Sequence, residues 1–336
     1  MRKGFTSGSA AAAAARAHAR FQMGHGPVTH VSITLPDKST MELPVECHPH
    51  GAMVIKDAGD DPDITHGAAF WAQVELCEHD PAIHIVGGEG VGVVTRPGLQ
   101  IPVGEAAINP VPRAMIEANV RGEIGTDRGA TVTIRVPEGR RLAERTFNPR
   151  LGIEGGISII GTTGIVEPMS LQALVEAIRC EIDVQLAEGH PITLVPGKIG
   201  EKHLQAQRPA AQTILVSNAF GEALEYLRHR GVRQLTIAGH PGKLAKLAMG
   251  FYNTHSSASP QAQDFVAHVL GLIGTYNTVE EICQAHHEAF DPLATRIAEQ
   301  VVKDWGFARV EVLLFDMPGA LLSESIGGCT PFIRPT

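Results

Sequence analysis

The sequence predicts two domains in series: an α+β domain in residues 1–150, and an α/β domain with a mostly parallel, Rossmann-like open sheet in residues 151–336. Three observations support this fold class. First, a chain of 336 residues is longer than one hydrophobic core usually serves. Second, apolar and polar residues alternate with period two in the first half, as in half-buried strands. Third, short apolar segments alternate with helical segments in the second half, which is typical of βα units on a parallel sheet.

The first half begins with a helix in the alanine-rich stretch GSAAAAAARAHAR. Alanine is the best helix former, and the hydroxyl groups of Thr6, Ser7 and Ser9 can cap the first turn. Alanine in place of leucine or valine, interrupted by basic residues, distinguishes this stretch from a signal peptide. A second helix is expected from Asn109, with early prolines and a closing Gly122. The expected strands are THVSITL, STMELPVE, AAFWAQVEL, AIHIVGG and ATVTIRV.

The second half alternates strand and helix candidates. The two clearest helices cover residues 171–187 and 219–230. A capping box from Thr278 to Glu281 opens another helix, and an Asp-Pro step at Asp291 separates it from the next one. The strand candidates are GISII, ITLVP, TILVS, QLTIAG and VEVLLFD.

Composition and charge exclude several classes of protein. Hydrophobic residues make up 43% of the chain and charged residues 19%, as in a globular protein. The formal net charge of -8 argues against a protein held to nucleic acid or anionic lipid by its overall field. No stretch reaches the roughly 18 to 20 apolar residues of a membrane span. The five cysteines lie far apart without a CxxC pair, so neither a disulfide framework nor a cysteine zinc site is predicted, and we expect a cytoplasmic protein.

Four loops after the predicted strands combine glycine with hydrogen-bonding side chains. In an open parallel sheet, ligands bind beyond the carboxyl ends of the strands, where helix N-termini present backbone N–H groups. GHPGK is too short for a phosphate-binding P-loop and has Leu244 in place of Ser or Thr, so it is a generic ligand loop or a plain turn with a capping histidine. The loops are GTTG (161–164), PGKIG (196–200), SN (217–218) and GHPGK (239–243), and their candidate ligand-binding residues are Thr162, Thr163, Ser217, Asn218, Gly239, His240, Gly242 and Lys243.

The loop KDAGDDPDITHGA, residues 56–68, concentrates four aspartates between glycines and a proline. Its spacing does not match a calcium-binding loop. Two interpretations stay open. The aspartates can accept backbone hydrogen bonds as turn residues, or one or two carboxylates can face a ligand while another accepts a proton, with like-charge crowding raising one pKa. The candidate catalytic residues are Asp57, Asp60, Asp61, Asp63 and His66.

Arginines gather in and around EGRRLAERTFNPR. Guanidinium groups match carboxylates and phosphates, so this cluster either recognises a polyanionic small molecule or is a solvated loop. GGEGVG (87–92) fails the GxGxxG spacing, and its Glu89 is either functional or an exposed turn acid. Cys283, His286 and His287 lack a second ligand cluster, so they do not predict a metal site. The arginines are Arg113, Arg135, Arg140, Arg141, Arg145 and Arg150.

Several long motifs follow one another from the first residues to about residue 260. They include KDAGDDPDITHGA, GGEGVGVVTRPGL, INPVPRAMI, FNPRLGIEGGISIIGTTGIVEPMS, SNAFGEAL and GHPGKLAKLAMGFYNTHS. With these motifs the chain closely resembles the CbiD family of cobalamin biosynthesis, the cobalt-precorrin-5B C(1)-methyltransferases. The resemblance implies transfer of a methyl group from S-adenosylmethionine (SAM) to carbon 1 of a contracted-ring tetrapyrrole, yielding cobalt-precorrin-6A. Neither composition nor spacing indicates SAM use, which only the resemblance implies.

Within this resemblance, the candidate residues take distinct roles. The acidic loop would lie near the sulfonium of SAM or remove a proton, and the glycine-containing loops of the second domain would form the SAM pocket. His66, His240 and His255 would form hydrogen bonds, which we favour over axial contact with cobalt, because the metal arrives inside the substrate. No protein-bound metal is therefore expected. The acetate and propionate carboxylates of the macrocycle would bind Lys56, Arg113, Arg145 and Arg150.

Two motifs depart from the family pattern. The family opening, similar to GYTTGTCAAAAA, reads GFTSGSAAAAA here, with Ser9 and Ala10 where a Thr-Cys pair is usual, so no catalytic cysteine is expected there. The family GHIGK reads GHPGK, with Pro241 stiffening the loop. A non-catalytic tetrapyrrole carrier and a nicotinamide-dependent precorrin reductase stay open as other functions. The expected partners are the tetrapyrrole and SAM, and assembly into a homo-oligomer is left open.

Overall fold

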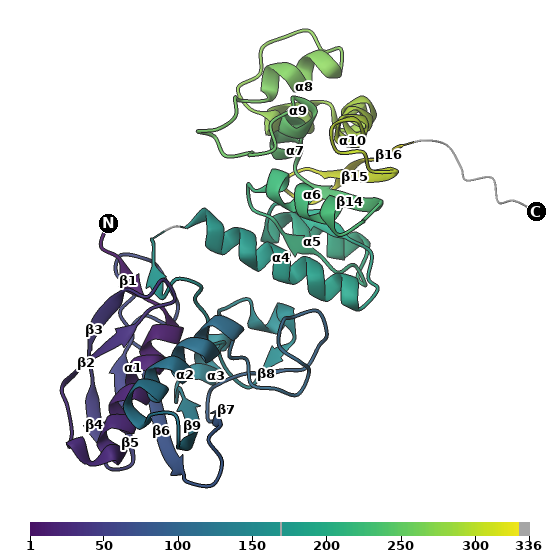
Figure 1. Cartoon of the computed structure of the whole chain (residues 1–336). Coiled ribbons are helices and arrows are strands. Elements are labelled where there is room, and N and C mark those ends of the chain that lie inside the picture. Colours follow the sequence, from purple (N-terminus) through teal and green to yellow (C-terminus); the bar gives the residue numbers. More distant parts are fainter. Residues whose placement is uncertain (169, 329–336) are drawn as a thin grey trace, which may run out of the picture. The chain divides into compact units, whose positions relative to one another are not determined.

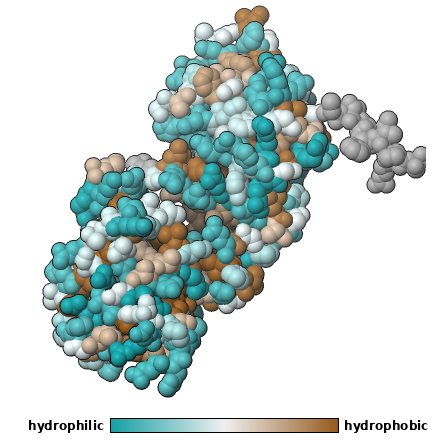
Figure 2. Space-filling view, viewed as in Figure 1, coloured by the Kyte–Doolittle hydropathy of each residue, from teal (hydrophilic) through white to brown (hydrophobic). Residues whose placement is uncertain are grey.

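The computed structural model describes residues 1–168 and 170–328 of the chain (Figure 1). The chain divides into two compact units, Met1–Leu171 and Gln172–Thr336. Each unit combines helices with β-sheet, which confirms the predicted mixture of α and β structure. In the view of Figure 2, hydrophilic residues cover much of the visible surface of unit 1, and hydrophobic residues form small groups between them.

The break between the units falls after Leu171, later than the change of texture at residue 150 predicts. The reason is that the intervening segment pairs with unit 1. Strand β10 (Ile153–Glu154) pairs with β8 (Val93–Val94), and β11 (Ile165–Val166) pairs with β1 (Gly4–Phe5). The expected strand GISII is wrong as a strand of the parallel sheet, because it belongs to this segment of unit 1 and forms only isolated bridges.

Unit 1 is built around a five-stranded sheet in the order β4-β5-β6-β9-β7. Neighbouring strands are antiparallel, except for the parallel pair β7 and β9. A separate hairpin pairs β2 (His30–Thr34) with β3 (Thr40–Pro44). The other elements are β4 (Glu46–His48), β5 (Gly51–Ile55), β6 (Ala69–Cys77), β7 (Ile83–Gly87), β9 (Gly129–Arg135), α1 (Ser7–Arg20), α2 (Pro110–Ile124) and α3 (Gly139–Ala143).

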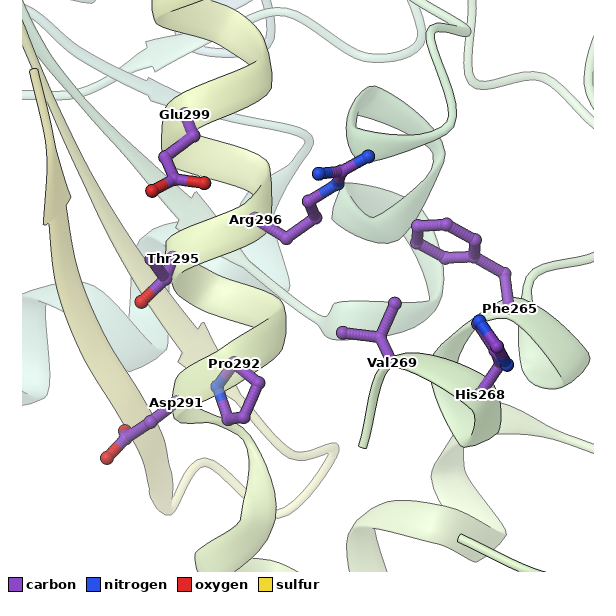
Figure 3. Close-up of a pocket in the computed structure, with 8 residues that line it drawn as sticks. All are labelled: Phe265, His268, Val269, Asp291, Pro292, Thr295, Arg296 and Glu299. Atoms are coloured by element: carbon purple, nitrogen blue, oxygen red, sulfur yellow. The ribbon is translucent and has the colours of Figure 1, made fainter. Parts of the chain in front are cut away.

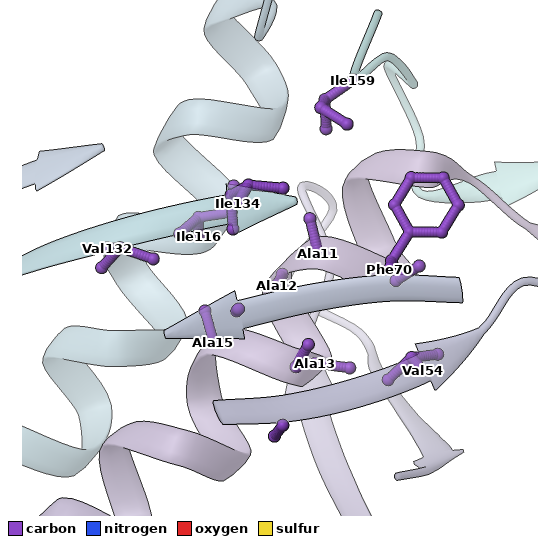
Figure 4. Close-up of a cluster of buried hydrophobic side chains, with 14 of the residues drawn as sticks. Ala11, Ala12, Ala13, Ala15, Val54, Phe70, Ile116, Val132, Ile134 and Ile159 are labelled. Atoms are coloured by element: carbon purple, nitrogen blue, oxygen red, sulfur yellow. The ribbon is translucent and has the colours of Figure 1, made fainter. Parts of the chain in front are cut away.

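Helix α1 forms the centre of the core of unit 1. The Thr6 hydroxyl oxygen caps it by accepting the N–H of Ser9 at 3.2 Å, which confirms the predicted helix start. Residues 10–15 are alanines without exposed surface, and their small side chains let α1 lie close to the sheet and to α2. Figure 4 shows four of these alanines, Ala11, Ala12, Ala13 and Ala15, grouped with Phe70 of the sheet and Ile116 of α2.

The second predicted helix is confirmed as α2, with one difference at its end. Asn109 occupies the N-cap position and prolines follow in the first turn, as expected. The helix continues past Gly122 to Ile124 and ends at Gly125, which has a positive φ of 77°. Glycine adopts this backbone conformation without strain, so Gly125 is suited to end the helix.

Unit 2 contains a five-stranded mixed sheet in the order β13-β12-β14-β15-β16. The first four strands are parallel, and β16 (Leu321–Gly327), which the sequence did not predict, is an antiparallel edge strand. The chain passes from β13 to β14 on the opposite side of β12, so the direction of strand order reverses between β12 and β14. The parallel strands are β12 (Thr193–Val195), β13 (Ile214–Leu215), β14 (Gln234–Gly239) and β15 (Arg309–Phe315).

The helices predicted at 171–187 and 219–230 are confirmed as α4 and α6 to within one residue. The predicted capping box is also present, because the Thr278 hydroxyl oxygen accepts the N–H of Glu281 at 3.1 Å. Within the described part of the chain, no helix is long and apolar enough to cross a membrane. The helices of unit 2 are α4 (Leu171–Ala187), α5 (Lys198–Gln207), α6 (Phe220–His229), α7 (Pro241–Ala248), α8 (Gln263–Val269), α9 (Val279–Ala285) and α10 (Asp291–Trp305).

Candidate functional site

Residues 153–166 of unit 1 form an extended segment along which loops from distant motifs dock. The N–H of Ile157 donates to the carbonyl oxygen of Gly90 at 3.0 Å. The N–H of Gly8 donates to the carbonyl oxygen of Ile160 at the same distance. Further along, β11 pairs with β1 at the start of the chain. The segment therefore gathers the motifs GGEGVG, GFTSGS and GTTG within one unit.

The GTTG loop lies beside the N-terminus of α1. A Cβ added to Gly161 would lie 2.5 Å from the Thr6 side chain, so only glycine fits this close approach. The hydroxyl of Ser9 donates to the carbonyl oxygen of the last glycine of the loop at 2.7 Å. Thr162 and Thr163 are exposed. The sequence assigned this loop to the second domain, whereas the structure places it in unit 1 through these contacts with α1.

The acidic loop 56–68 binds the start of the chain. The guanidinium of Arg2 forms an ion pair with Asp57, and its Nη2 donates to Oδ1 at 2.8 Å. The backbone N–H of Arg2 donates to Oδ2 of Asp60 at 2.6 Å. The hydrogen bond from Arg2 is the main cause that lowers the pKa of Asp57 to about 2. These two carboxylates thus hold the N-terminal strand against the loop.

A second cation neutralises the other end of the same loop. The side chain of Lys56 is buried, forms an ion pair with Asp63 and donates to the Thr65 hydroxyl at 2.6 Å. Burial lowers the pKa of Lys56, and the Asp63 charge opposes this effect. Burial would raise the pKa of Asp63, but the charge of Lys56 and hydrogen bonds from Thr65 hold it below its ordinary value. The predicted contact of Lys56 with a substrate carboxylate gains no support from this position.

Two of the four aspartates in the acidic loop, Asp57 and Asp63, form ion pairs with cations of unit 1. Neither Asp57 nor Asp63 has the raised pKa that like-charge crowding was expected to give one carboxylate, because the pKa values of both are lowered. Each of these carboxylates faces a cation instead of another carboxylate. Asp63 also accepts the backbone N–H of Thr65 at 2.7 Å, as a turn residue does.

His66, His240 and His255 share one arrangement, in which Nδ1 of the ring accepts a backbone N–H. An imidazole whose Nδ1 accepts a hydrogen bond carries its proton on Nε2, so Nε2 is a donor. This arrangement favours hydrogen-bonding roles over axial contact of Nε2 with cobalt. The three N–H donors belong to Ala58 at 3.1 Å, Gly242 at 3.0 Å and Ser257 at 3.2 Å, in that order.

The parallel strands of unit 2 bring three of the predicted loops to one edge of the sheet. Strand β12 leads into PGKIG, β13 into SN and β14 into GHPGK. A Cβ added to Gly239 would lie 2.9 Å from the ring of Pro196, so the loops after β12 and β14 approach each other closely. They meet where the strand order reverses, which is the position at which open α/β sheets bind ligands.

Asn218 joins the loop after β13 to the segment after α7. Its side-chain oxygen accepts the hydroxyl of Thr254 at 3.2 Å, and the carbonyl oxygen of Thr254 accepts the buried ammonium of Lys246 at 3.0 Å. Ser217 has a φ of 53°, a left-handed conformation that costs a non-glycine residue energy and is concentrated at functional loops. Lys243 is half-buried beside this network, and burial lowers its pKa. The loops after β13 and β14 therefore combine a strained backbone at Ser217 with the positive charges of Lys243 and Lys246.

Sequence reasoning missed the partner that holds the GHPGK loop. Nε2 of His240 donates to Oε2 of Glu280 at 2.9 Å, and the N–H of Met317 donates to the same oxygen at 3.3 Å. The sulfur of Cys283 lies 4.0 Å from Nε2, and the ligand atoms of this trio lie within 4.8 Å of one another, close enough to share a metal ion. A metal on Nε2 would move the ring proton to Nδ1 and leave the N–H of Gly242 without its acceptor. The geometry therefore fits a hydrogen-bonded cap better than a metal centre.

The cations predicted to bind substrate differ in their access. Arg113 donates to three backbone carbonyl oxygens, including that of Ile108 at 2.9 Å, so it ties loops of unit 1 to α2. Arg145 is exposed and Arg150 is half-buried. Together with the burial of Lys56, these positions leave Arg145 as the predicted cation with the most open access.

A groove of about 740 Å³ lies elsewhere in unit 2, between α8 and α10. Figure 3 shows Arg296 reaching from α10 toward Phe265 and Val269 of α8. The groove is lined by none of the loop residues that the sequence singles out. A smaller pocket of about 130 Å³ lies on the sheet of unit 1.

Comparisons with known proteins found a family model, curated relatives and one solved structure. The family model described as CbiD matches residues 1–168. A cobalt-precorrin-5B C(1)-methyltransferase of Moorella thermoacetica is 45% identical over 82% of this chain and 76% of its own length. One of Syntrophotalea carbinolica is 46% identical over 84% of this chain and 83% of its own length. A crystal structure of a cobalamin biosynthesis protein (cbiD) from Archaeoglobus fulgidus is 30% identical, covers 79% of this chain and 84% of that chain, and has a TM-score of 0.44.

Proposed function

The chain belongs to the CbiD family, and from this membership we propose that it transfers the methyl group of SAM to carbon 1 of cobalt-precorrin-5B, giving cobalt-precorrin-6A in cobalamin biosynthesis. The observation that carries the proposal is the identity of 45% and 46% with relatives of that name over more than four fifths of this chain. The family motifs quoted above extend through both units, so the resemblance is not confined to one of them.

SAM supplies the methyl group as a sulfonium, and its transfer to a ring carbon is an in-line displacement. Holding two reactants aligned and dry can lower such a barrier by roughly 7 to 11 kcal/mol. The residues of this chain therefore act mainly by positioning the two molecules. A nucleophilic side chain is not required for this reaction.

We place the SAM pocket at the carboxyl edge of the sheet of unit 2. Its support is the position of the loops where strand order reverses, the left-handed backbone of Ser217 and the half-buried ammonium of Lys243 at the end of the GHPGK loop. An ammonium group suits the carboxylate of SAM, and loop N–H groups suit its ribose and adenine. Thr162 and Thr163 lie in unit 1 and are left out of this pocket. The proposed SAM-binding residues are Ser217, Asn218, Gly239, His240, Gly242 and Lys243.

We propose that unit 1 contributes the acidic loop to binding of the macrocycle. With a pKa of about 2, Asp57 stays ionised at neutral pH and is a poor proton acceptor. Its role in this proposal is to stabilise positive charge, while Nε2 of His66 offers a hydrogen-bond donor nearby. Asp60 and Asp61 share this role, and Arg145 is the cation proposed for a substrate carboxylate.

The test is to incubate the purified full chain with cobalt-precorrin-5B and SAM that carries an isotopically labelled methyl group. We expect one labelled methyl on carbon 1, detected by product mass and by NMR of the labelled carbon. Binding of the tetrapyrrole without transfer of label would refute the proposal and indicate a carrier. Oxidation of a nicotinamide cofactor in place of methyl transfer would indicate a reductase.

A further inference from the structure

The loop after β14 is contacted by α9, a helix to which the sequence assigns no functional residue. Glu280 lies in the first turn of α9, and α9 packs against α7, the helix that follows the GHPGK loop (Figure 1). A Cβ added to Gly242 would lie 3.4 Å from Cβ of Val279, which is ordinary van der Waals contact. The start of α9 is therefore packed directly on the loop that leads into α7.

The carboxylate of Glu280 accepts hydrogen bonds from two loops at once. Its Oε2 accepts Nε2 of His240, in the loop after β14, at 2.9 Å, and the N–H of Met317, in the loop after β15, at 3.3 Å. Its Oε1 accepts the side-chain amide of Gln284, one turn further along α9, at 3.2 Å. The side chains of His240 and Glu280 are only 23% and 22% exposed, so water has limited access to their contact. One oxygen atom thus joins two loops of unit 2.

Both ring nitrogens of His240 are engaged in hydrogen bonds. Nδ1 accepts the N–H of Gly242 at 3.0 Å, and Nε2 donates to Glu280. A ring in this state has no free nitrogen to take a proton from a substrate, so its action is to fix the backbone. The carbonyl oxygen of His240 accepts the N–H groups of Lys243 at 3.1 Å and Leu244 at 3.2 Å. The orientation of His240 therefore sets the path of the loop.

The loop after β15 is anchored on two sides. The N–H of Met317 donates to Glu280, and its carbonyl oxygen lies 3.2 Å from Nε2 of His203 on α5. Within the loop, Oδ1 of Asp316 accepts the N–H of Gly319 at 2.7 Å and closes a turn. Strand β15 pairs with β14 in parallel, so the loops that follow the two strands leave the same edge of the sheet. Removing the Glu280 carboxylate would release both loops at this edge.

We infer that Glu280 is a positioning residue for SAM, because it holds the loops after β14 and β15 together at the edge of the proposed SAM pocket. This inference rests on the proposed function and adds the loop after β15 to that pocket. The two N–H donors need an acceptor oxygen at this place and not a negative charge. A metal ligand or a proton acceptor would need the charge. One substitution separates these requirements.

The experiment compares Glu280→Gln with Glu280→Ala in the full chain. Glutamine keeps a side-chain oxygen at this position, and Gln284 can turn its own amide oxygen toward the new NH₂ group, whereas alanine removes the acceptor. We expect Glu280→Ala to raise the KM for SAM, and the Kd measured by calorimetry, about tenfold, with the KM for the tetrapyrrole within about twofold of wild type. Glu280→Gln should restore SAM affinity to within about threefold of wild type.

Glu281→Ala is the matched control, because it removes a carboxylate from the same turn of α9. The Oε2 atom of Glu281 accepts the N–H of Asn277 at 2.8 Å, so this variant weakens the start of the helix without removing the acceptor of His240. We expect its SAM affinity to stay near the wild-type value. Circular dichroism of each variant checks that the chain is folded.

Each outcome decides the inference apart from the proposed function. Unchanged SAM affinity in Glu280→Ala would overturn the inference, while methyl transfer by the wild type would still support the proposed function. An equal loss in Glu280→Gln would overturn it too, because the charge would then matter, and an equal loss in Glu281→Ala would assign the effect to the stability of α9. Weak SAM binding by Glu280→Ala alone, together with no methyl transfer by the wild type, would support the positioning role and refute the proposed function.

Discussion

Lys56 and Asp63 form an ion pair inside the acidic loop, with the Lys56 side chain only 2% exposed. A buried ammonium needs a counter-charge, because taking a charge out of water costs several kcal/mol unless it is paired and hydrogen-bonded. Asp63 supplies the charge and Thr65 a hydroxyl acceptor. The charge of Asp63 therefore stabilises the conformation of the acidic loop itself.

Removing one partner of this pair should destabilise unit 1. For Lys56→Met we expect a loss of about 3 kcal/mol in the free energy of unfolding, at the lower end for buried pairs because Asp63 remains partly exposed. The double variant Lys56→Met with Asp63→Asn should lose less than the sum of the two single variants. Urea unfolding measures both. Lys202→Met on α5, an exposed position, is the control, and a loss as small as in this control would contradict the assignment.

The contact between Arg2 and Asp57 predicts a pH dependence. The folded pKa of Asp57 is about 2, below the value of about 3.9 for a free aspartate. Because the folded pKa is the lower one, the stabilising contribution is fully present above about pH 4 and is lost as the pH falls toward 2. NMR titration of the Asp57 carboxyl carbon should show this value, and Arg2→Gln should move it upward. An unchanged titration in Arg2→Gln would disprove the contact.

The sequence could predict those parts of the fold that depend on local patterns. Helix α1 follows from its alanines and from Thr6, and strands β2, β3, β6, β7 and β9 of unit 1 follow from period-two alternation. Strand β5, which lies between β4 and β6 in the sheet, was not predicted. GISII has the same apolar pattern as a buried strand, yet it docks between loops of unit 1. The spacing of apolar residues indicates that a segment is buried, but it does not indicate which other segment it packs against. The boundary between the units could therefore not be predicted from it.

In the candidate site, too, the sequence predicted the loops but not the residues that contact them. The four aspartates of the acidic loop are visible in the sequence, but the partner of Asp57 is Arg2, which lies 55 positions away. Likewise the sequence singles out His240, whereas Glu280 is 40 positions away on another helix. A contact across such a separation depends on tertiary structure, so local sequence reasoning finds the loop and misses what holds it.

The proposed SAM pocket predicts a loss of SAM affinity when its charge is removed. Lys243→Met should weaken SAM binding about tenfold, because it deletes a charge-assisted hydrogen bond to the SAM carboxylate. Asn218→Ala should weaken it as well by releasing the Thr254 segment. Isothermal titration with SAM measures both. Lys202→Met should bind SAM like wild type, and wild-type affinity in Lys243→Met and Asn218→Ala would place the pocket elsewhere.

Ala10 occupies the position where the family pattern usually has a cysteine, and it is fully buried in α1. We expect Ala10→Cys to turn over like wild type and to cost about 1 to 3 kcal/mol in unfolding free energy, because the added sulfur overpacks a core in which alanines let α1 lie close to its neighbours. A thiol at this depth would be shielded from solvent and slow to react. Mass spectrometry should therefore find no extra adduct over wild type after brief treatment of the native variant with a maleimide.

Ser9→Ala, at the neighbouring position, tests the same helix end by removing a side-chain hydroxyl, whereas Ala10→Cys adds a thiol. It removes the hydroxyl that donates to the GTTG loop at 2.7 Å, so we expect a loss of about 1 kcal/mol in unfolding free energy. If the thiol of Ala10→Cys instead raised turnover tenfold or reacted at once with the maleimide, the N-terminus of α1 would have to open onto the reacting atoms. The buried packing of α1 would then not describe the working enzyme, and the role of the opening motif would be catalytic instead of structural.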